Sequence, residues 1–588
     1  MPSSRLGAWV SAIALVGLCF GCSAGGKDSK TNPGGGGGSS STGSTSNNGG
    51  DLVLGGSVSL GGDINVGGDS PTVDDVPTTC EQAALKRTYM GCDFWPTITY
   101  NPVYTDFDFA VVIANSNAGD ATVTVTGPND FKATDTVPAN GLKAITLPWV
   151  DALKGPEFSR TNTQDGRAKD SVRVDGGAYH VTATIPVTAW QFNPLQYSKP
   201  MSGITKGCGT TFNTANCFSA SNDASLLVPS TAMTGDYRVF GRSASLGGAA
   251  GMAFTSASSG MAITATKMGT HVTLAFPAGC AAGTFSPPAG GCVAPSVTPG
   301  VMASAGGTKA EYDMNAGDVL QLVGVFAAGD SLQHADLSGT IVSATQPVQV
   351  IAFNPISNIP DNATNADHVE ETVLPAQVIG KKYIVAPPTS PSGTVKGGHV
   401  VRIYGNFDDT TLTYAPAAPA GAPTSIAAGA VVEFGPVTDA FSVEGSQPFV
   451  VGSFMVGGSL QAPSGDACPN FPCRGDPSMS MEVTPQQFRK QYTFLAPADY
   501  ETNFADILVP DGATVMLDGA APTSAPQAIG ATGWSIIREP LKADGGGVHK
   551  LSSDKNVGLQ VMGFGHASSY YTPGGLNLEL ISDPPVVK

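Results

Sequence analysis

The side chains best suited to metal binding or acid–base chemistry are concentrated in one short run, Asp367-His368-Val369-Glu370-Glu371. Carboxylate and imidazole groups are ligands for divalent metals, so a metal site is one interpretation of this run. The other interpretation is a solvated loop that leads into the strand Thr372-Val373-Leu374, with alternate side chains facing water. The sequence favours the solvated loop, and we therefore predict neither a metal site nor a bound cofactor.

The other residue types that commonly act in catalysis are scattered along the chain. The histidines stand singly, with no His-rich metal spacing and no Gly-x-Ser-x-Gly nucleophile elbow. They are His180, His271, His334, His368, His399, His549 and His566. A glycosidase pair of carboxylates about 5–10 Å apart in space leaves no trace in sequence spacing. We predict no catalytic residues and no enzyme activity, and an extracellular hydrolase acting on glycans stays open as an alternative.

The cysteines divide into two N-terminal residues and four close pairs. The pairs are Cys80/Cys92, Cys208/Cys217, Cys280/Cys292 and Cys468/Cys473. Neighbouring cysteines inside loop-rich segments are typical of exported, disulfide-bonded proteins, so we predict four nearest-neighbour disulfides. Zinc is disfavoured because no pair has the two-residue separation of a zinc knuckle.

A motif that returns four times indicates the architecture that positions these residues. A proline or glycine is followed by an aliphatic or aromatic residue, a Val or Ala, and a phenylalanine six positions after the start. The copies are Pro186 to Phe192, Pro347 to Phe353, Pro448 to Phe454 and Gly558 to Phe564. Three are preceded by a second motif, Pro229 to Tyr237, Pro375 to Tyr383 and Pro485 to Tyr492, and a first copy enters at Tyr89. Such self-similarity predicts an array of related domains.

The predicted fold is all-β. Runs such as Thr122-Val123-Thr124-Val125-Thr126 have the period of a half-buried strand, and Gly and Pro recur at turn positions. We therefore predict tandem antiparallel β-sandwich-like modules over residues 80–205, 206–360, 361–465 and 466–588. The repeated phenylalanines should be equivalent core residues, buried either through a bulge or because their strands are covered on both faces.

The N-terminus predicts export. Arg5 precedes an apolar run, Ala8 to Gly21, that has the length of a signal-peptide core and ends at Cys22. A small residue before cysteine is what a lipoprotein signal peptidase reads, so residues 1–21 are a predicted signal peptide and Cys22 the lipidated first residue. An ordinary secretory signal is the alternative. Ser23 resembles the sorting residue of outer-membrane lipoproteins, so outer-membrane anchoring at the cell surface is expected.

Residues 22–79 are predicted to be a flexible Gly/Ser-rich linker. Gly34–Gly38 and the serines that follow lack the apolar surface that ordering needs. The stretch from Leu52 to Gly68 is similar to a calcium β-roll but lacks the repeated aspartates, which favours a linker.

The charge balance excludes one class of partner. The formal net charge is −17, whereas nucleic acid and anionic lipid surfaces require a basic footprint. We expect no nucleic-acid partner, and contact with the membrane through the lipid anchor only.

Several segments carry a family resemblance. They are Asn222 to Pro229 with Gly235 to Val239, Glu371 to Pro375 with Gly380 to Ala386, Ala178 to Pro194, and Cys80 to Trp95. Over about residues 80–575 the chain resembles the N-terminal domain of the IgGFc-binding proteins, as found in bacterial surface proteins. The resemblance implies a secreted or surface protein that binds or adheres, without an established enzymatic activity. It carries over no binding residue and does not imply that this chain binds antibody.

These observations predict a surface-anchored binding or adhesion lipoprotein whose ligand is an unknown extracellular protein or glycan. A structural stalk or extracellular matrix component is the second alternative beside the hydrolase. An extended array with only shallow surfaces would favour the binder or the stalk, and a cleft with two close carboxylates would favour the hydrolase.

Overall fold

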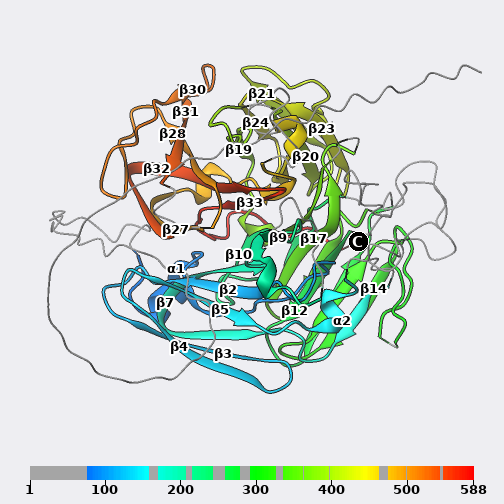
Figure 1. Cartoon of the computed structure of the whole chain (residues 1–588). Helices are drawn as coiled ribbons and strands as arrows, with labels where there is room; N and C mark the ends of the chain where they lie inside the picture. Colours follow the sequence, from blue (N-terminus) through cyan, green and yellow to red (C-terminus); the bar gives the residue numbers. More distant parts are fainter. Residues whose placement is uncertain are drawn as a thin grey trace, which may run out of the picture. The chain divides into compact units, whose positions relative to one another are not determined.

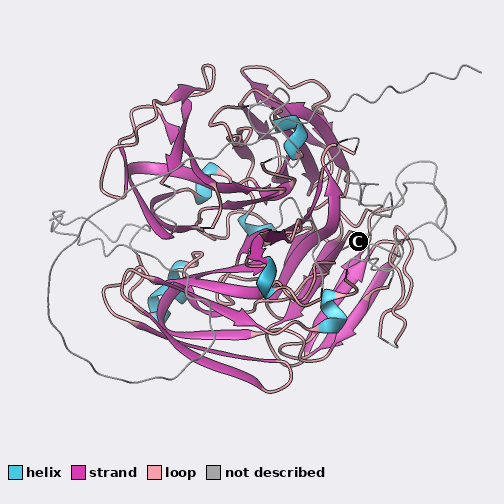
Figure 2. Ribbon diagram, in the orientation of Figure 1, coloured by secondary structure: helices cyan, strands magenta, loops and turns pink. Residues whose placement is uncertain are grey.

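The structure is a computed structural model. It describes residues 76–157, 170–206, 215–242, 259–278, 292–298, 300–325, 336–361, 363, 365–395, 397–461, 474–497, 499–542 and 547–587. All of these residues belong to one compact unit. Antiparallel strands dominate it (Figures 1 and 2), which confirms the all-β prediction. Among the described residues, no helix combines the length and apolarity that crossing a bilayer would need.

The first sandwich is organised around one long strand. Its strands are β1 (Gly91–Phe94), β2 (Phe109–Ala114), β3 (Ala121–Gly127), β4 (Phe131–Val137), β5 (Leu142–Leu147), β7 (His180–Asn193) and β10 (Asp223–Leu226). The first half of β7 pairs with β1 and β3, and its second half pairs with β2 and β10. One strand therefore belongs to both layers.

In the second sandwich, two shorter strands on either side of Pro347 replace the single long strand, one in each layer. One sheet has the order β11 (Asp236–Arg238), β16 (Ile341–Ala344), β13 (Thr270–Ala275), β14 (Lys309–Met314). The other has the order β18 (Ala366–Thr372), β17 (Val348–Asn358), β12 (Gly260–Ala265), β15 (Val319–Val323), β6 (Val172–Val174). Strand β6 comes from the range predicted for the first module.

The third sandwich repeats this plan, with Pro448 at the break. One sheet has the order β19 (Lys382–Val385), β24 (Phe441–Gly445), β21 (Thr410–Ala415), β22 (Ser425–Ile426). The other has the order β23 (Val431–Val437), β20 (His399–Gly405), β25 (Phe449–Met455), β26 (Ser478–Met481).

The fourth sandwich again uses one long strand, β32 (Gly547–Gly565). Its first half pairs with β27 (Arg489–Ala496) and β29 (Val515–Leu517), and its second half pairs with β28 (Thr502–Pro510) and β33 (Ser568–Pro573). Strands β31 (Trp534–Leu541) and β30 (Gln527–Ala528) extend the sheet beyond β28.

The remaining elements are short. They are α1 (Cys80–Lys86), α2 (Asp151–Lys154), α3 (Gly458–Gln461), η1 (Met201–Gly203), η2 (Ala376–Val378), η3 (Pro485–Gln487), and the two-stranded pair β8 (Ser198–Pro200) and β9 (Asn216–Phe218).

Four strands, one from each sandwich, meet at the centre of the described unit. Strand β10 contacts β18 and β33, and β26 contacts the same two strands. We call β10, β18, β26 and β33 the central ring; Figure 1 shows β10 and β33 in the middle of the view. Each ring strand follows the long strand of its sandwich, so β10 and β26 lie past the predicted ends of the first and third modules. The predicted boundaries stay a prediction.

The repeated phenylalanines occupy matching places. Each is paired on one side with a ring strand and on the other with β2, β12, β20 or β28. Phe192, Phe353, Phe454 and Phe564 are all at most 2% exposed. The prediction of equivalent core residues is confirmed, and the neighbouring residues on the same strands are buried too, so these strands are covered on both faces.

The repeated tyrosines fasten the two layers of a sandwich. The hydroxyls of Tyr237 and Tyr383 donate to the carbonyl oxygens of Val348 (2.5 Å) and Phe449 (2.7 Å). Tyr492 donates in the same way to Val557. Each hydroxyl also accepts the backbone N–H three residues earlier. These bonds give hydrogen-bond partners to backbone groups beside the point where the chain passes from one layer to the other.

Tyr89 does something different. Its hydroxyl accepts from the N–H of Thr493 (2.9 Å) and donates to the carbonyl oxygen of the same residue (3.2 Å). Its backbone N–H donates to Leu576, and the N–H of Leu578 donates to the carbonyl of Arg87. The start of the described chain is thus joined to the fourth sandwich and to the segment after it.

Candidate functional site

The acidic run that stands out in the sequence lies in the central ring. Residues 366–372 form β18, and all seven are buried. The prediction of a solvated loop is therefore wrong. The error has a physical cause: polar side chains imply solvent only when no buried partner is available, and partners are present here.

Glu370 shows how the run is accommodated. Its carboxylate accepts hydrogen bonds from Thr99 (2.5 Å), Gln191 (2.8 Å) and Asn193 (3.1 Å). These residues are 177 to 271 positions away in sequence. The imidazole of His368 lies 3.4 Å from the same carboxylate, and both side chains are fully buried. Satisfied in this way, the carboxylate of Glu370 avoids much of the cost of burial.

Asp223 connects three ring strands. One carboxylate oxygen accepts the backbone N–H of Glu370 on β18 (2.9 Å), and the other accepts the hydroxyl of Ser478 on β26 (2.8 Å). Sequence reasoning gave Asp223 no role, although it occupies the start of the strand that aligns with β18 when Pro229 and Pro375 are superposed.

Burial changes the titration of the ring carboxyls. It raises the pKa of Asp223 and of Glu371 well above their ordinary values. It does the same for Asp367 and Asp476, and the charge of Asp476 raises the pKa of Asp367 further. Burial also raises the pKa of Glu482, just after β26, to about 8. These groups retain their protons above the usual range, because a charge there would be poorly solvated.

The ring does not present a reaction site to solvent. Its titratable side chains are at most 4% exposed. Among the described residues, no three His, Cys, Asp or Glu side chains are grouped so that they could hold a metal ion. The chemistry of the ring is therefore that of a buried hydrogen-bond network.

A histidine–serine pair in the third sandwich is enclosed in the same way. Nδ1 of His399 lies 2.6 Å from the hydroxyl of Ser453, and both residues are fully buried. Burial lowers the pKa of His399 to about 3, so the imidazole is neutral. Without access to solvent, this pair meets no substrate.

One cleft opens to solvent between the second and third sandwiches, with a volume of about 350 Å³. Its lining comes from the ends of β11, β13, β14 and β16, the turn after β20, the turn between β22 and β23, and Val586 of the C-terminal segment. The polar groups in it belong to Arg238, Thr308, Lys309, Asn406 and Asp408.

Arg238 and Asn406 are the most buried of these residues. Nη1 donates to the carbonyl oxygen of Gly339 (2.7 Å), and Nη2 and Nε donate to the backbone and side-chain oxygens of Asn406 (3.2 and 3.3 Å). All three acceptors are neutral. Burial lowers the pKa of Arg238 to about 10, with the charge of Asp408 opposing the shift.

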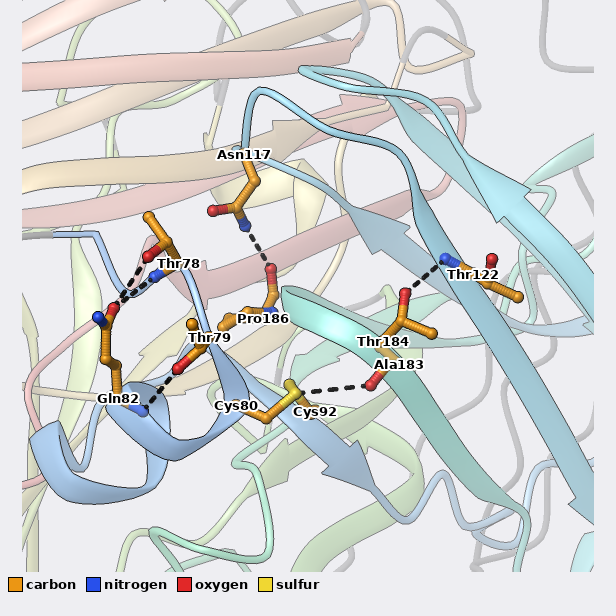
Figure 3. Close-up of a disulfide and its surroundings, with 10 residues drawn as sticks. All are labelled: Thr78, Thr79, Cys80, Gln82, Cys92, Asn117, Thr122, Ala183, Thr184 and Pro186. Carbon is orange, nitrogen blue, oxygen red and sulfur yellow. Dashed lines mark hydrogen bonds between the residues drawn. A yellow bond between two sulfur atoms is a disulfide. The ribbon is translucent and has the colours of Figure 1, made fainter.

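The predicted disulfides are seen in part. Cys80 on α1 is bonded to Cys92 on β1, as Figure 3 shows. Helix α1 begins after Thr79, whose hydroxyl accepts the N–H of Gln82 (3.2 Å), an N-cap that fixes the position of Cys80. Cys217 and Cys292 are also disulfide-bonded.

The other predicted site residues lie outside the described residues. They are Cys22, Cys208, Cys280, Cys468 and Cys473. Lipidation and the pairing of these cysteines stay predictions.

Comparison with known proteins gives one family. A family model described as IgGFc binding protein matches residues 223–563. The match begins at the first residue of β10 and ends within β32. The curated proteins contain no match.

Among solved structures, a crystal structure of a tetra-tandem repeat in the extending region of a large adhesion protein is 11% identical. It covers 83% of this chain and 99% of that chain with a TM-score of 0.08, which is too low to bear on the fold. The family match covers more than half of the sequence, so the chain belongs to the IgGFc-binding protein family, a family of binding proteins rather than of enzymes.

Proposed function

We propose that this protein is a surface lipoprotein, anchored through Cys22, whose four-sandwich unit binds an extracellular protein. Family membership supports the coarser statement that the chain is an extracellular or surface binding protein. The observation that carries the proposal is that the match spans three of the four ring strands, from β10 onward, and so includes most of this β architecture.

The placement of the ionisable groups supports binding over hydrolysis. A glycan hydrolase needs two carboxyl groups at the wall of an open cleft. The carboxyls with the largest pKa shifts lie instead in the enclosed ring, where they join strands to one another. The open cleft between the second and third sandwiches has Arg238 and Lys309 among its lining residues and one carboxylate, Asp408.

Binding is tested with the full chain on the surface of intact cells. Labelled extracellular proteins, with an immunoglobulin Fc fragment as a defined probe, are added to cells that carry the protein and to cells that lack it. We expect saturable retention of a protein species that is lost after protease treatment of the probe and kept after enzymatic deglycosylation. Retention that survives proteolysis but not deglycosylation would show a glycan ligand and overturn the proposal.

The anchor is tested by Cys22→Ser. Removal of the sulfur that would carry the lipid should move the protein from the membrane fraction to the soluble fraction. Cys19→Ser is the matched control and should leave the protein in the membrane fraction. A Cys22→Ser variant that sediments with membranes as the natural protein does would show that another feature holds it there.

A further inference from the structure

We propose that the cleft at Arg238 is a binding subsite for one carboxylate side chain, Asp or Glu, of an acidic peptide segment in the protein partner. The inference deepens the proposed function and rests on it in one respect, that the partner is a protein.

A guanidinium group carries five N–H donors. In Arg238, the three hydrogen bonds to Gly339 and Asn406 use one donor each on Nε, Nη1 and Nη2. One N–H on each terminal nitrogen is left without an acceptor among the described residues. Two donors on adjacent nitrogens are the arrangement that holds a carboxylate through two hydrogen bonds.

Among the described residues, Arg238 also has no direct counter-ion. Arg242, Arg402 and Arg538 are buried to a similar extent, and each forms an ion pair with a carboxylate. Arg238 is 3% exposed, yet its bonded acceptors are neutral oxygens. Asp408 acts on it only as a nearby charge, while its own carboxylate accepts the N–H of Ala428 (3.1 Å). A buried cation with neutral partners attracts an anionic ligand more strongly than a solvated one does.

The surroundings of the guanidinium leave space for such a ligand. Gly429 lies beside the guanidinium, because a Cβ added to it would be in van der Waals contact with Nη1 at 3.7 Å. Lys309 is exposed at the start of β14 and adds a second positive charge to the lining. The volume of about 350 Å³ is at the small end of the roughly 300–1,000 Å³ range of ligand pockets.

The remaining lining favours a peptide over an acidic sugar. It is mostly apolar, with Phe276, Pro277, Ile341 and Phe407 in the walls. Thr308 and Asn406 are the uncharged polar side chains, and Asn406 is already bonded to Arg238. A sugar would leave hydroxyl groups without partners against such walls, whereas an apolar residue beside Asp or Glu would be buried by them.

The experiment titrates the full chain with two capped dipeptides and one sugar acid by calorimetry. The dipeptides are acetyl-Glu-Phe-amide and its neutral analogue acetyl-Gln-Phe-amide, and the sugar acid is glucuronate. We expect the glutamyl peptide to bind one site at least tenfold more tightly than the glutaminyl peptide, with affinity falling as salt is raised. Equal affinities would overturn the inference, and saturable binding of glucuronate but not of the peptide would assign the cleft to acidic glycans instead.

Substitutions locate the site. Lys309→Gln should weaken the glutamyl peptide several-fold, while Lys267→Gln, at an exposed lysine of the same sandwich, should leave it unchanged. Arg238→Gln should abolish binding. Because that change removes bonds between two sandwiches, Thr308→Glu provides a second route: it puts a carboxylate of the protein into the lining and should block the peptide without loss of folding. Peptide binding that is unaffected by Lys309→Gln and Thr308→Glu would overturn the inference.

The outcomes separate this inference from the proposed function. Retention of the protein partner on cells, together with no peptide binding at the cleft, would refute the subsite alone. Loss of partner retention by cells that carry Thr308→Glu would show that the protein partner binds through this cleft.

Discussion

Single carboxyl groups in and beside the central ring are held where water cannot solvate a charge. Asp223, Asp367, Glu371 and Asp476 all have pKa values raised by burial. In the protonated form such a group both donates and accepts a hydrogen bond, so it can join strands without a counter-ion. The ring therefore depends on protons that these residues would release to water if the chain unfolded.

Glu482 gives this dependence a measurable sign. Its pKa is raised from 4.5 to about 8, so between these values the folded protein holds a proton that the unfolded chain has lost. The contribution of Glu482 to the unfolding free energy is then fully present below pH 4.5. It is lost as pH rises toward 8, with a slope of about 1.4 kcal/mol per pH unit for one such group. We expect Glu482→Gln to reduce the loss of unfolding free energy between pH 5 and 8, measured by urea denaturation. Glu444→Gln, at an exposed residue, should leave the slope unchanged, and an unaltered slope in Glu482→Gln would show that Glu482 is ionised in the fold.

At the scale of elements, each sandwich is built around the strand that carries its repeated phenylalanine. These strands have sheet neighbours on both sides and are covered on both faces. A side chain removed from such a strand leaves a cavity that few neighbours can fill.

Phe353 offers the test at this scale. Phe353→Ala should lower the unfolding free energy by about 3–5 kcal/mol, as truncation of buried aromatic residues does. Thermal denaturation followed by circular dichroism measures the change. Val297→Ala, at a side chain that is 83% exposed, is the control and should leave the midpoint within error. A Phe353→Ala protein with an unchanged midpoint would show that the ring of Phe353 does not support the core.

What the sequence predicts at this scale follows from local patterns. Alternating Thr and Val predict strands such as β3, and repeated Pro, Val and Phe predict the strands around Phe353 and Phe454. The burial of β18 is beyond such patterns, because the carboxylate of Glu370 is satisfied by Thr99, Gln191 and Asn193 from a remote part of the chain. The cleft at Arg238 is unpredictable for the same reason, since it is formed where Asn406 and Gly339 meet. Superposing Pro229 on Pro375 was the available signal, because it aligns β10 with β18.

At the scale of the whole described unit, the segment that contains Arg87 is hydrogen-bonded to the C-terminal segment and to the residues before β11. The guanidinium of Arg87 donates to the carbonyl oxygens of Leu578 (3.3 Å), Thr231 (3.3 Å) and Ala232 (2.9 Å). The side chain of Gln487 joins the same C-terminal segment to the end of η2, because it donates to the carbonyl oxygens of Glu579 and Val378. Segments from all four sandwiches therefore meet beside residues 574–582.

Arg87→Ala tests this attachment. Loss of the hydrogen bonds that Arg87 donates to these backbone carbonyls should lower the unfolding free energy by about 1–3 kcal/mol. Limited proteolysis should then cut the C-terminal segment faster than in the natural protein, because its attachment is weakened. Lys132→Ala, on the exposed edge strand β4, should change neither measurement. Equal rates of cleavage in Arg87→Ala would show that the segment is held by its backbone bonds alone.

The disulfide between Cys80 and Cys92 has a mechanical consequence for a protein pulled through its N-terminal end. Tension applied at residue 76 passes along the backbone to Cys80 and then across the sulfur–sulfur bond to β1. Residues 81–91 are bypassed, and these include Arg87 and Tyr89, which close the unit through Leu578, Leu576 and Thr493. The load is delivered instead to the pairing of β1 with β7. If the protein is tethered through Cys22, as we propose, this bond would carry shear at the attachment point past the contacts of Arg87 and Tyr89.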